Sequence, residues 1–183
     1  CSKILEAKFK LGLIENRFVD EDDISEKIFN QHHTQTALKL ARQGIVLLKN
    51  NDVLPLRRPK NSKNRILVTG PNANNQSILG DWHSAQPDEN VYTVFEGIKK
   101  IGTEMGYLVD YHDSNENIKR ISENDINKTI EVASEYDMVV LVIGDNSMRY
   151  KWNQKTAGEN TARAELNLAG KQLELAMRLK ESG

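Results

Sequence analysis

The sequence predicts an α/β domain with three layers, α/β/α, around a mainly parallel sheet. Short apolar runs rich in β-branched residues, typical of buried strands, alternate along the chain with segments whose apolar residues recur at helical spacing. Such an alternation favours parallel strands joined by right-handed crossovers. The expected strands are 65–69, 107–111 and 138–143, and the later expected helices are 93–101, 125–134 and 172–180.

The first helix is expected to begin after Asn30 or Thr34, because either side chain can cap a helix. It is expected to end near Lys49, because Asn50-Asn51-Asp52 favours a turn and Pro55 follows. The apolar residues of this segment have the spacing of one helical face: Ala37, Leu38, Ala41, Ile45 and Leu48.

Turn residues separate the later elements. Gly70-Pro71-Asn72 ends the first strand, and a turn around Gly106 leads into the second. The run Met138 to Ile143, closed by Gly144, is typical of a strand buried on both faces of a sheet. Three strands are few for four helices, so we expect further strands beyond Gly183 and an incomplete sheet in this chain.

Composition narrows the classes of function. The 183 residues are 38% hydrophobic and 28% charged, which is ordinary for a globular domain. A net charge of -1 gives no electrostatic reason to bind nucleic acid or an anionic membrane, and no apolar run has the length of a membrane span. His83 and His112 are scattered, so no metal-ligand spacing is present and no cofactor is expected. The single cysteine, Cys1, does not reveal the redox compartment.

The chain is expected to divide into a tail, residues 1–25, and a domain, residues 26–183. The tail carries a short apolar patch and then the acidic run Asp20 to Asp23, which favours a linker over a separate domain. Basic side chains gather just before the first strand, where a solvated loop is the favoured interpretation. They are Arg57, Arg58, Lys60, Lys63 and Arg65.

The chemistry is expected in the loop after the strand 138–143. Ligands of open α/β sheets bind outside the carboxyl ends of the strands, and Asp145, Asn146 and Ser147 occupy that position here. A long polar loop follows, and a loop of that length is uncommon unless it is functional or disordered. We therefore interpret this loop as the candidate site.

An ordered series of segments carries a resemblance to a known family. The segments are ALKLARQGIVLLKN (37–50), LPL (54–56), ILVTGPNA (66–73), LGDW (79–82), TVFEGIK (93–99), VVLVIGDN (139–146) and GENTARAELNLAGKQLEL (158–175). Together they resemble the carboxyl-terminal α/β sandwich domain of glycoside hydrolase family 3, the β-glucosidase and β-xylosidase family. The earlier segment KFKLGLIENRFVD (8–20) is similar to the end of that family's catalytic barrel and the linker after it.

The resemblance implies a retaining β-glycosidase whose active site is shared between two domains. Such enzymes use two carboxyl groups roughly 5 to 5.5 Å apart, one as nucleophile and one as general acid and then base. The nucleophile would be an aspartate on a barrel domain that this chain lacks. The segment GENTARAELNL assigns the acid/base role to Glu159, with Asp145 as the second candidate and Glu165 as the third. The segment alone is expected to be inactive.

The same resemblance implies a β-linked oligosaccharide or glycoside as substrate and the missing barrel as partner. The residues expected to bind substrate are Trp82, Asp145, Asn146 and Arg163. Trp82 can stack on a sugar face, Trp152 is open between stacking and packing, and Arg163 can orient Glu159 or form a surface ion pair. The sequence does not give the localisation, and a periplasmic or secreted protein is compatible with the resemblance.

Three other interpretations remain open. Gly70-Pro71-Asn72-Ala73 after a strand suggests a nucleotide-binding module, although the further glycines and the lysine of such motifs are absent. Ser147 suggests an esterase, although it is not in a G-x-S-x-G elbow and no histidine follows it in the chain. The domain can also be a non-catalytic carbohydrate-binding or interdomain module.

Overall fold

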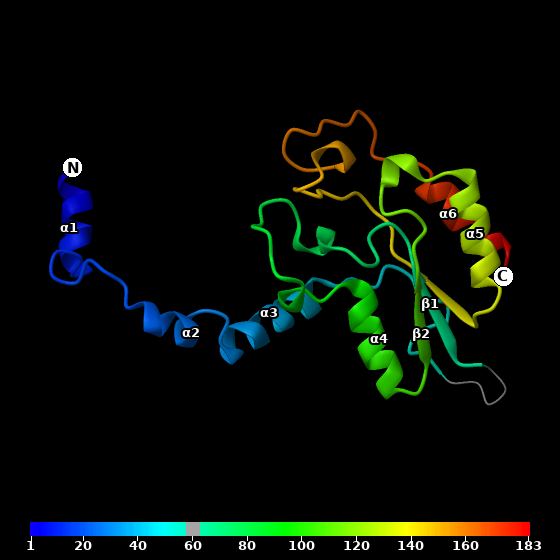
Figure 1. Ribbon diagram of the computed structural model, residues 1–183, viewed down its shortest axis with the longest axis horizontal. Helices are drawn as coiled ribbons and strands as arrows, with labels where there is room; N and C mark the ends of the chain where they lie inside the picture. The colour runs from blue at the N-terminus through cyan, green and yellow to red at the C-terminus, as the bar shows by residue number, and fades with distance from the viewer. Residues whose placement is uncertain (58–62) are drawn as a thin grey trace. The chain divides into compact units, whose positions relative to one another are not determined.

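The structure is a computed structural model that describes residues 1–57 and 63–183 (Figure 1). Two of the basic residues noted above, Arg58 and Lys60, lie outside the described residues. The chain divides into two compact units, Cys1–Leu56 and Arg57–Gly183. The sequence-based boundary after residue 25 stays a prediction.

The first unit is helical, with α1 at Ser2–Lys10, α2 at Ile24–Lys27 and α3 at Gln31–Gly44. Asn30 caps α3, because its side chain accepts a hydrogen bond of 3.0 Å from the backbone N–H of His33. The predicted helix end near Lys49 is wrong. Gly44 and the β-branched pair Ile45-Val46 are weak helix formers, and the backbone is already extended at Ile45.

The second unit is built on a parallel sheet with the strand order β2-β1-β3. Its elements are β1 (Arg65–Thr69), α4 (Val94–Glu104), β2 (Leu108–His112), α5 (Glu123–Ala133), β3 (Met138–Leu141) and α6 (Gln172–Glu181). Ile66 of β1 lies opposite Val109 of β2 and Met138 of β3, and both pairings are parallel. The predicted α/β class with a parallel sheet is confirmed.

Helices cover both faces of this sheet, with α4 on one side and α5 and α6 on the other (Figure 1). Leu67 faces α5 and α6, and the apolar cluster there comprises Leu67, Ile121, Ile126, Ala133, Leu175 and Leu179. Val109 pairs with Ile66, so it points to the opposite face, toward α4. A Cβ on Gly102 of α4 would lie 2.6 Å from Val109 Cγ2, so the missing side chain allows this close packing. The predicted three-layer arrangement is confirmed.

Two capping boxes set the starts of α4 and α5. The Thr93 hydroxyl accepts from the N–H of Glu96, and the Glu96 carboxylate accepts from the N–H of Thr93. Ser122 and Asp125 make the same reciprocal pair at α5. Because Ser122 is the cap, α5 begins at Glu123, earlier than the expected start at Asp125.

The central strand and the edge strand differ in burial. β1 is buried from Ile66 to Thr69, whereas all four residues of β3 are partly exposed. The sequence predicted buried strands at both places, which is confirmed for β1 and wrong for β3, because within the described sheet β3 pairs on one side only. The extended pairing runs slightly past β3, since the Val142 N–H donates to the Thr69 carbonyl at 2.8 Å. This contact brings together the loops that follow β1 and β3.

Candidate functional site

Two loops meet at the carboxyl edge of the sheet. We call residues 70–92, after β1, the first loop, and residues 142–171, after β3, the second loop. The Asn72 side-chain amide donates to the Gly144 carbonyl at 3.2 Å, and the Asn146 amide donates to Asn72 Oδ1 at 3.1 Å. Gly70 has a φ of +109°, and a Cβ there would lie 2.2 Å from the Val142 carbonyl oxygen. Close packing of the two loops therefore explains this glycine without a bound nucleotide.

The second loop is pinned to α6 and folded back on itself. The Gly144 N–H donates to the side chain of buried Gln172 at 2.9 Å. The backbone N–H groups of Thr156 and Ala157 both donate to the Asn146 carbonyl, at 2.9 and 3.0 Å. In return the Asn146 N–H donates to the Thr156 hydroxyl at 2.9 Å. These contacts fix the position of Thr156 and Ala157, which immediately precede Gly158 and Glu159.

A buried ion pair links the first loop to the backbone of Glu159. Lys155 Nζ lies 2.9 Å from Asp81 Oδ1 and donates also to the Glu159 carbonyl at 3.0 Å. The Glu159 N–H donates to Asp81 Oδ2 at 2.6 Å. The Lys155 side chain is only 1% exposed, so this ammonium group depends on protein partners instead of water. Asp81 and Lys155 together bind both ends of the Glu159 backbone.

Asp81 is held in its charged form. The hydrogen bond from the Glu159 N–H, followed by that from the Lys155 ammonium, keeps the pKa of the Asp81 carboxyl below its usual range. A carboxylate that stays ionised can only accept hydrogen bonds, so both of its contacts persist at neutral pH.

Arg149 gathers the aromatic and acidic candidates around one guanidinium. Its Cζ lies 4.6 Å from the ring centroid of Trp82 and 5.8 Å from that of Trp152, within the range of cation–π attraction. Its Nη1 lies 3.9 Å from Glu159 Oε2. Trp82 is 76% exposed and the Glu159 side chain 41% exposed. The structure thus brings Trp82 and Glu159 together through an arginine.

The other predicted site residues also lie in the second loop. Arg163 pairs with both carboxylate oxygens of Asp145, and its Nη2 donates to the Asn167 carbonyl. Asn146 is buried, and among the described residues its Oδ1 has no hydrogen-bond partner. Glu165 lies on the exposed surface of the second loop. Asp145 is therefore hydrogen-bonded directly to a cation, whereas Glu159 is paired more loosely with Arg149, whose Nη1 lies 3.9 Å from Glu159 Oε2.

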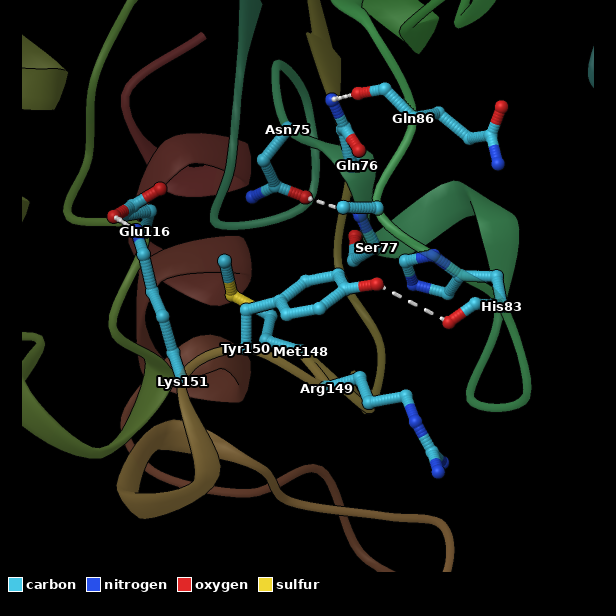
Figure 2. Close-up of a pocket in the computed structure, with 11 residues that line it drawn as sticks. Asn75, Gln76, Ser77, His83, Gln86, Glu116, Met148, Arg149, Tyr150 and Lys151 are labelled. Carbon is cyan, nitrogen blue, oxygen red and sulfur yellow. Dashed lines mark hydrogen bonds and ion pairs between the residues drawn. The ribbon is translucent and has the colours of Figure 1, made fainter.

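A cavity of about 400 Å³ lies between the two loops beside Arg149 (Figure 2). The Tyr150 hydroxyl points across it and donates to the His83 carbonyl at 3.3 Å. The rings of these two residues meet edge to face with centroids 5.6 Å apart. The other lining residues are Asn75, Gln76, Ser77, Ala85, Gln86, Glu116, Met148, Arg149 and Lys151. Arg149 therefore lies between this cavity and Glu159.

Sequence reasoning did not single out Asp81 and Lys155. Asp81 belongs to the LGDW segment, next to the Trp82 that was singled out, so a signal for it was present. Lys155 is one lysine in a polar loop, and no spacing predicts that it is buried. Ser147, the esterase candidate, is buried as well, which leaves a nucleophile there little access to substrate.

Residues 1–57 and 63–183 contain no group of three or more His, Cys, Asp or Glu side chains arranged to hold a metal ion. Among these same residues, no helix combines the length and the apolar character needed to cross a membrane.

Fold and loops together define an α/β domain that presents carboxylate, guanidinium and indole groups at the carboxyl edge of its sheet. Residues 45–183 match the family model described as the glycosyl hydrolase family 3 C-terminal domain. The chain therefore belongs to glycoside hydrolase family 3, as the ordered segments of the sequence predicted.

Curated relatives and solved structures agree with this family. The chain is 32% identical to a β-xylosidase of Formosa agariphila, covering 100% of this chain and 24% of the relative. It is 25% identical to a periplasmic β-glucosidase of Salmonella typhimurium, covering 98% and 25%. The crystal structure of β-glucosidase from Listeria innocua in complex with glucose matches with a TM-score of 0.75 and 25% identity, over 98% of this chain and 22% of that one. The chain thus spans about a quarter of these proteins.

Proposed function

We propose that this domain supplies the general acid/base, Glu159, of a retaining β-glycosidase whose nucleophile lies on a barrel domain of the same protein. One observation carries the proposal: the Glu159 carboxylate is exposed at the carboxyl edge while its backbone is bound on both sides by Asp81 and Lys155. A proton donor needs this combination of a fixed origin and access to substrate.

In the first step Glu159 gives its proton to the oxygen of the departing group while the nucleophile attacks the anomeric carbon. In the second step the Glu159 carboxylate takes a proton from water, which attacks the covalent intermediate. Arg149, with Nη1 at 3.9 Å, stabilises the carboxylate that exists between the two steps. The domain therefore contributes proton transfer, and the barrel contributes the covalent bond.

The surrounding side chains suit the substrate side of the reaction. The exposed ring of Trp82 offers a flat apolar surface for a pyranose, and Trp152 offers a second one. Asp145 and Arg163 present oxygen and N–H groups to sugar hydroxyls as a pair, while Asn146 supports the loop from below. The relatives are named β-xylosidases and β-glucosidases, so we propose terminal β-linked xylose or glucose as substrate. The periplasmic relative favours a periplasmic or secreted protein.

The test compares wild type with Glu159→Gln in the full-length protein that carries this domain. Aryl β-glycosides with a good leaving group, such as 2,4-dinitrophenol, need little protonation, whereas phenyl glycosides depend on it. We expect kcat/KM to fall about 10²- to 10⁴-fold for the phenyl glycoside and to stay within about fivefold of wild type for the dinitrophenyl one.

Asp145→Asn is the matched control, because it removes the second candidate carboxylate from the same loop. If Glu159→Gln hydrolyses both substrates normally while Asp145→Asn shows the selective loss, the acid/base is Asp145. If neither variant is selective, the domain acts as a non-catalytic carbohydrate-binding or interdomain module, which the exposed Trp82 would also suit.

A further inference from the structure

We infer that the Asp81–Lys155 ion pair acts as the positioning device for Glu159, setting where its carboxyl group meets the leaving oxygen. This inference rests on the proposed function of Glu159. The charged groups of both residues contact each other and the Glu159 backbone, so we assign them a role that acts through Glu159.

The first line of support is that the pair binds Glu159 at both ends of its backbone. Asp81 Oδ2 accepts from the Glu159 N–H at 2.6 Å, and Lys155 Nζ donates to the Glu159 carbonyl at 3.0 Å. The Asp81–Lys155 contact of 2.9 Å closes this ring of interactions. A residue held at both its N–H and its carbonyl has little freedom to rotate its peptide units, so the origin of the Glu159 side chain is fixed.

The conformation of Gly158, which precedes Glu159, also supports the positioning role. Gly158 has a φ of +94°, and a Cβ there would lie 2.5 Å from Asp81 Oδ2. The backbone therefore approaches Asp81 more closely than any other residue would allow. The carboxylate is in contact with the turn itself, and the turn delivers Glu159.

Burial of the lysine is the third line of support. The Lys155 ammonium is enclosed by Asp81, the Glu159 carbonyl and the Trp152 ring, whose centroid lies 4.4 Å away. Removing both charges of a pair from water costs about as much as their attraction returns, so buried pairs are poor sources of stability. They do fix geometry, because each charge must keep its partner. A charged pair at this place is therefore better explained by orientation of Glu159 than by stabilisation of the fold.

The two members of the pair come from different loops. Asp81 belongs to the first loop and Lys155 to the second, so the pair transmits the position of one loop to the backbone of the other. A displacement of about 1 Å at a reacting group can cost about 100-fold in rate. Loss of the pair should therefore reduce proton donation while Glu159 itself is still present.

The experiment uses Lys155→Met in the full-length protein, because methionine keeps the length of the side chain and removes the charge. Rates are normalised to functional sites, counted from the burst of dinitrophenolate released by a slowly turned-over 2-fluoro glycoside. We expect kcat/KM to fall about 10- to 100-fold for the phenyl glycoside and less than about threefold for the dinitrophenyl glycoside. Asp81→Asn, which keeps the shape of Asp81, should show the same selectivity and serves if Lys155→Met does not fold.

Lys171→Met is the matched control, since Lys171 forms an ion pair with Glu123 between α5 and α6, outside the two contacts of Glu159. It should leave the ratio of the two rates at the wild-type value. Equal losses for both substrates in Lys155→Met and Asp81→Asn, or no loss in either, would overturn the positioning role. Glu159→Gln is measured beside them: if it is selective and the pair variants are not, the positioning inference alone fails. If Glu159→Gln is not selective, the proposed function fails first.

Discussion

The sheet with its helices and the two loops at its carboxyl edge are stabilised in different ways. Between α5, α6 and the sheet, most of the fully buried side chains are apolar, such as Leu67, Ile126 and Leu175, and the polar Thr129 and Gln172 are buried beside them. In the second loop the buried side chains are polar, such as Lys155, which donates to Asp81, and Thr156, whose hydroxyl accepts from the Asn146 N–H. Apolar burial is not directional and supplies most of the folding free energy, whereas hydrogen bonds add little net stability but set distances and angles.

The layered part therefore supplies the stability of the fold, and the two loops set the geometry of the candidate site. The layered part holds the loops at one edge, and it can do so with any well-packed set of apolar residues. Under the proposed function the loops place one carboxylate, and contacts such as that between Asp81 and the Glu159 N–H suit this task because they have one favourable geometry. Mutations in the two regions should therefore have separable effects on unfolding and on proton transfer.

The largest effect on stability is expected in the layered part. Leu175 of α6 is fully buried in the apolar cluster, so Leu175→Ala should lower the free energy of unfolding by about 2 to 5 kcal/mol. The ratio of rates for the phenyl and dinitrophenyl glycosides should not change in molecules that remain folded. Urea unfolding of the full-length protein, combined with the burst-normalised kinetics, measures both quantities.

Leu173→Ala is the control for that substitution, because Leu173 lies on the same helix but is 54% exposed. It should change the free energy of unfolding by less than about 0.5 kcal/mol. Equal destabilisation by the two alanines would mean that the cluster around Leu67 is not the main source of stability. A change in the ratio of rates would mean that the two regions are not separable.

In the loops, a pH-dependent contribution to the free energy of unfolding is expected. The pKa of Asp81 is lowered in the folded state by the Glu159 N–H and by Lys155, so the folded protein favours the carboxylate. This contribution to stability is complete above the unfolded-state pKa of about 3.9 and is lost as the pH falls through the lower, folded-state value. The stability difference between wild type and Asp81→Asn should therefore be constant from pH 7 to pH 5.

Below about pH 4 that difference should shrink, since wild type then loses the charge that the variant never had. Subtracting the free energy of unfolding of the variant from that of wild type at each pH removes the acid sensitivity that the two proteins share. A difference that grows toward low pH, or that does not change at all, would show that the Asp81 carboxylate is not stabilised by its partners.

Most of the layered part could be predicted from the sequence, because its signals are local. The strand at Ile66 to Val68 and the helix start at Thr93 each depend on residues that are adjacent in the sequence. The errors in the predicted helix end and strand burial arose where the structure depends on residues beyond the local segment. The sequence extended α3 beyond Gly44 because the apolar spacing continued, and it predicted burial on both faces for β3, which is an edge strand of the described sheet.

The site could be predicted only in part, because its contacts join residues far apart in the chain. Glu159 and Trp82 are candidates through the resemblance to a family, and the structure joins them through Arg149. The contacts of Asp81 with Lys155 and with the Glu159 backbone depend on how two loops pack, and no local pattern encodes that packing.

Chemical rescue by azide can test whether Glu159 is the acid/base of a retaining enzyme. Glu159→Ala in the full-length protein is given a dinitrophenyl β-glycoside with and without sodium azide. Without its base the covalent intermediate should accumulate, and azide, which needs no deprotonation, should accelerate turnover and yield the β-glycosyl azide. Wild type should form no such product. If azide neither accelerates Glu159→Ala nor appears in its product, Glu159 is not the acid/base.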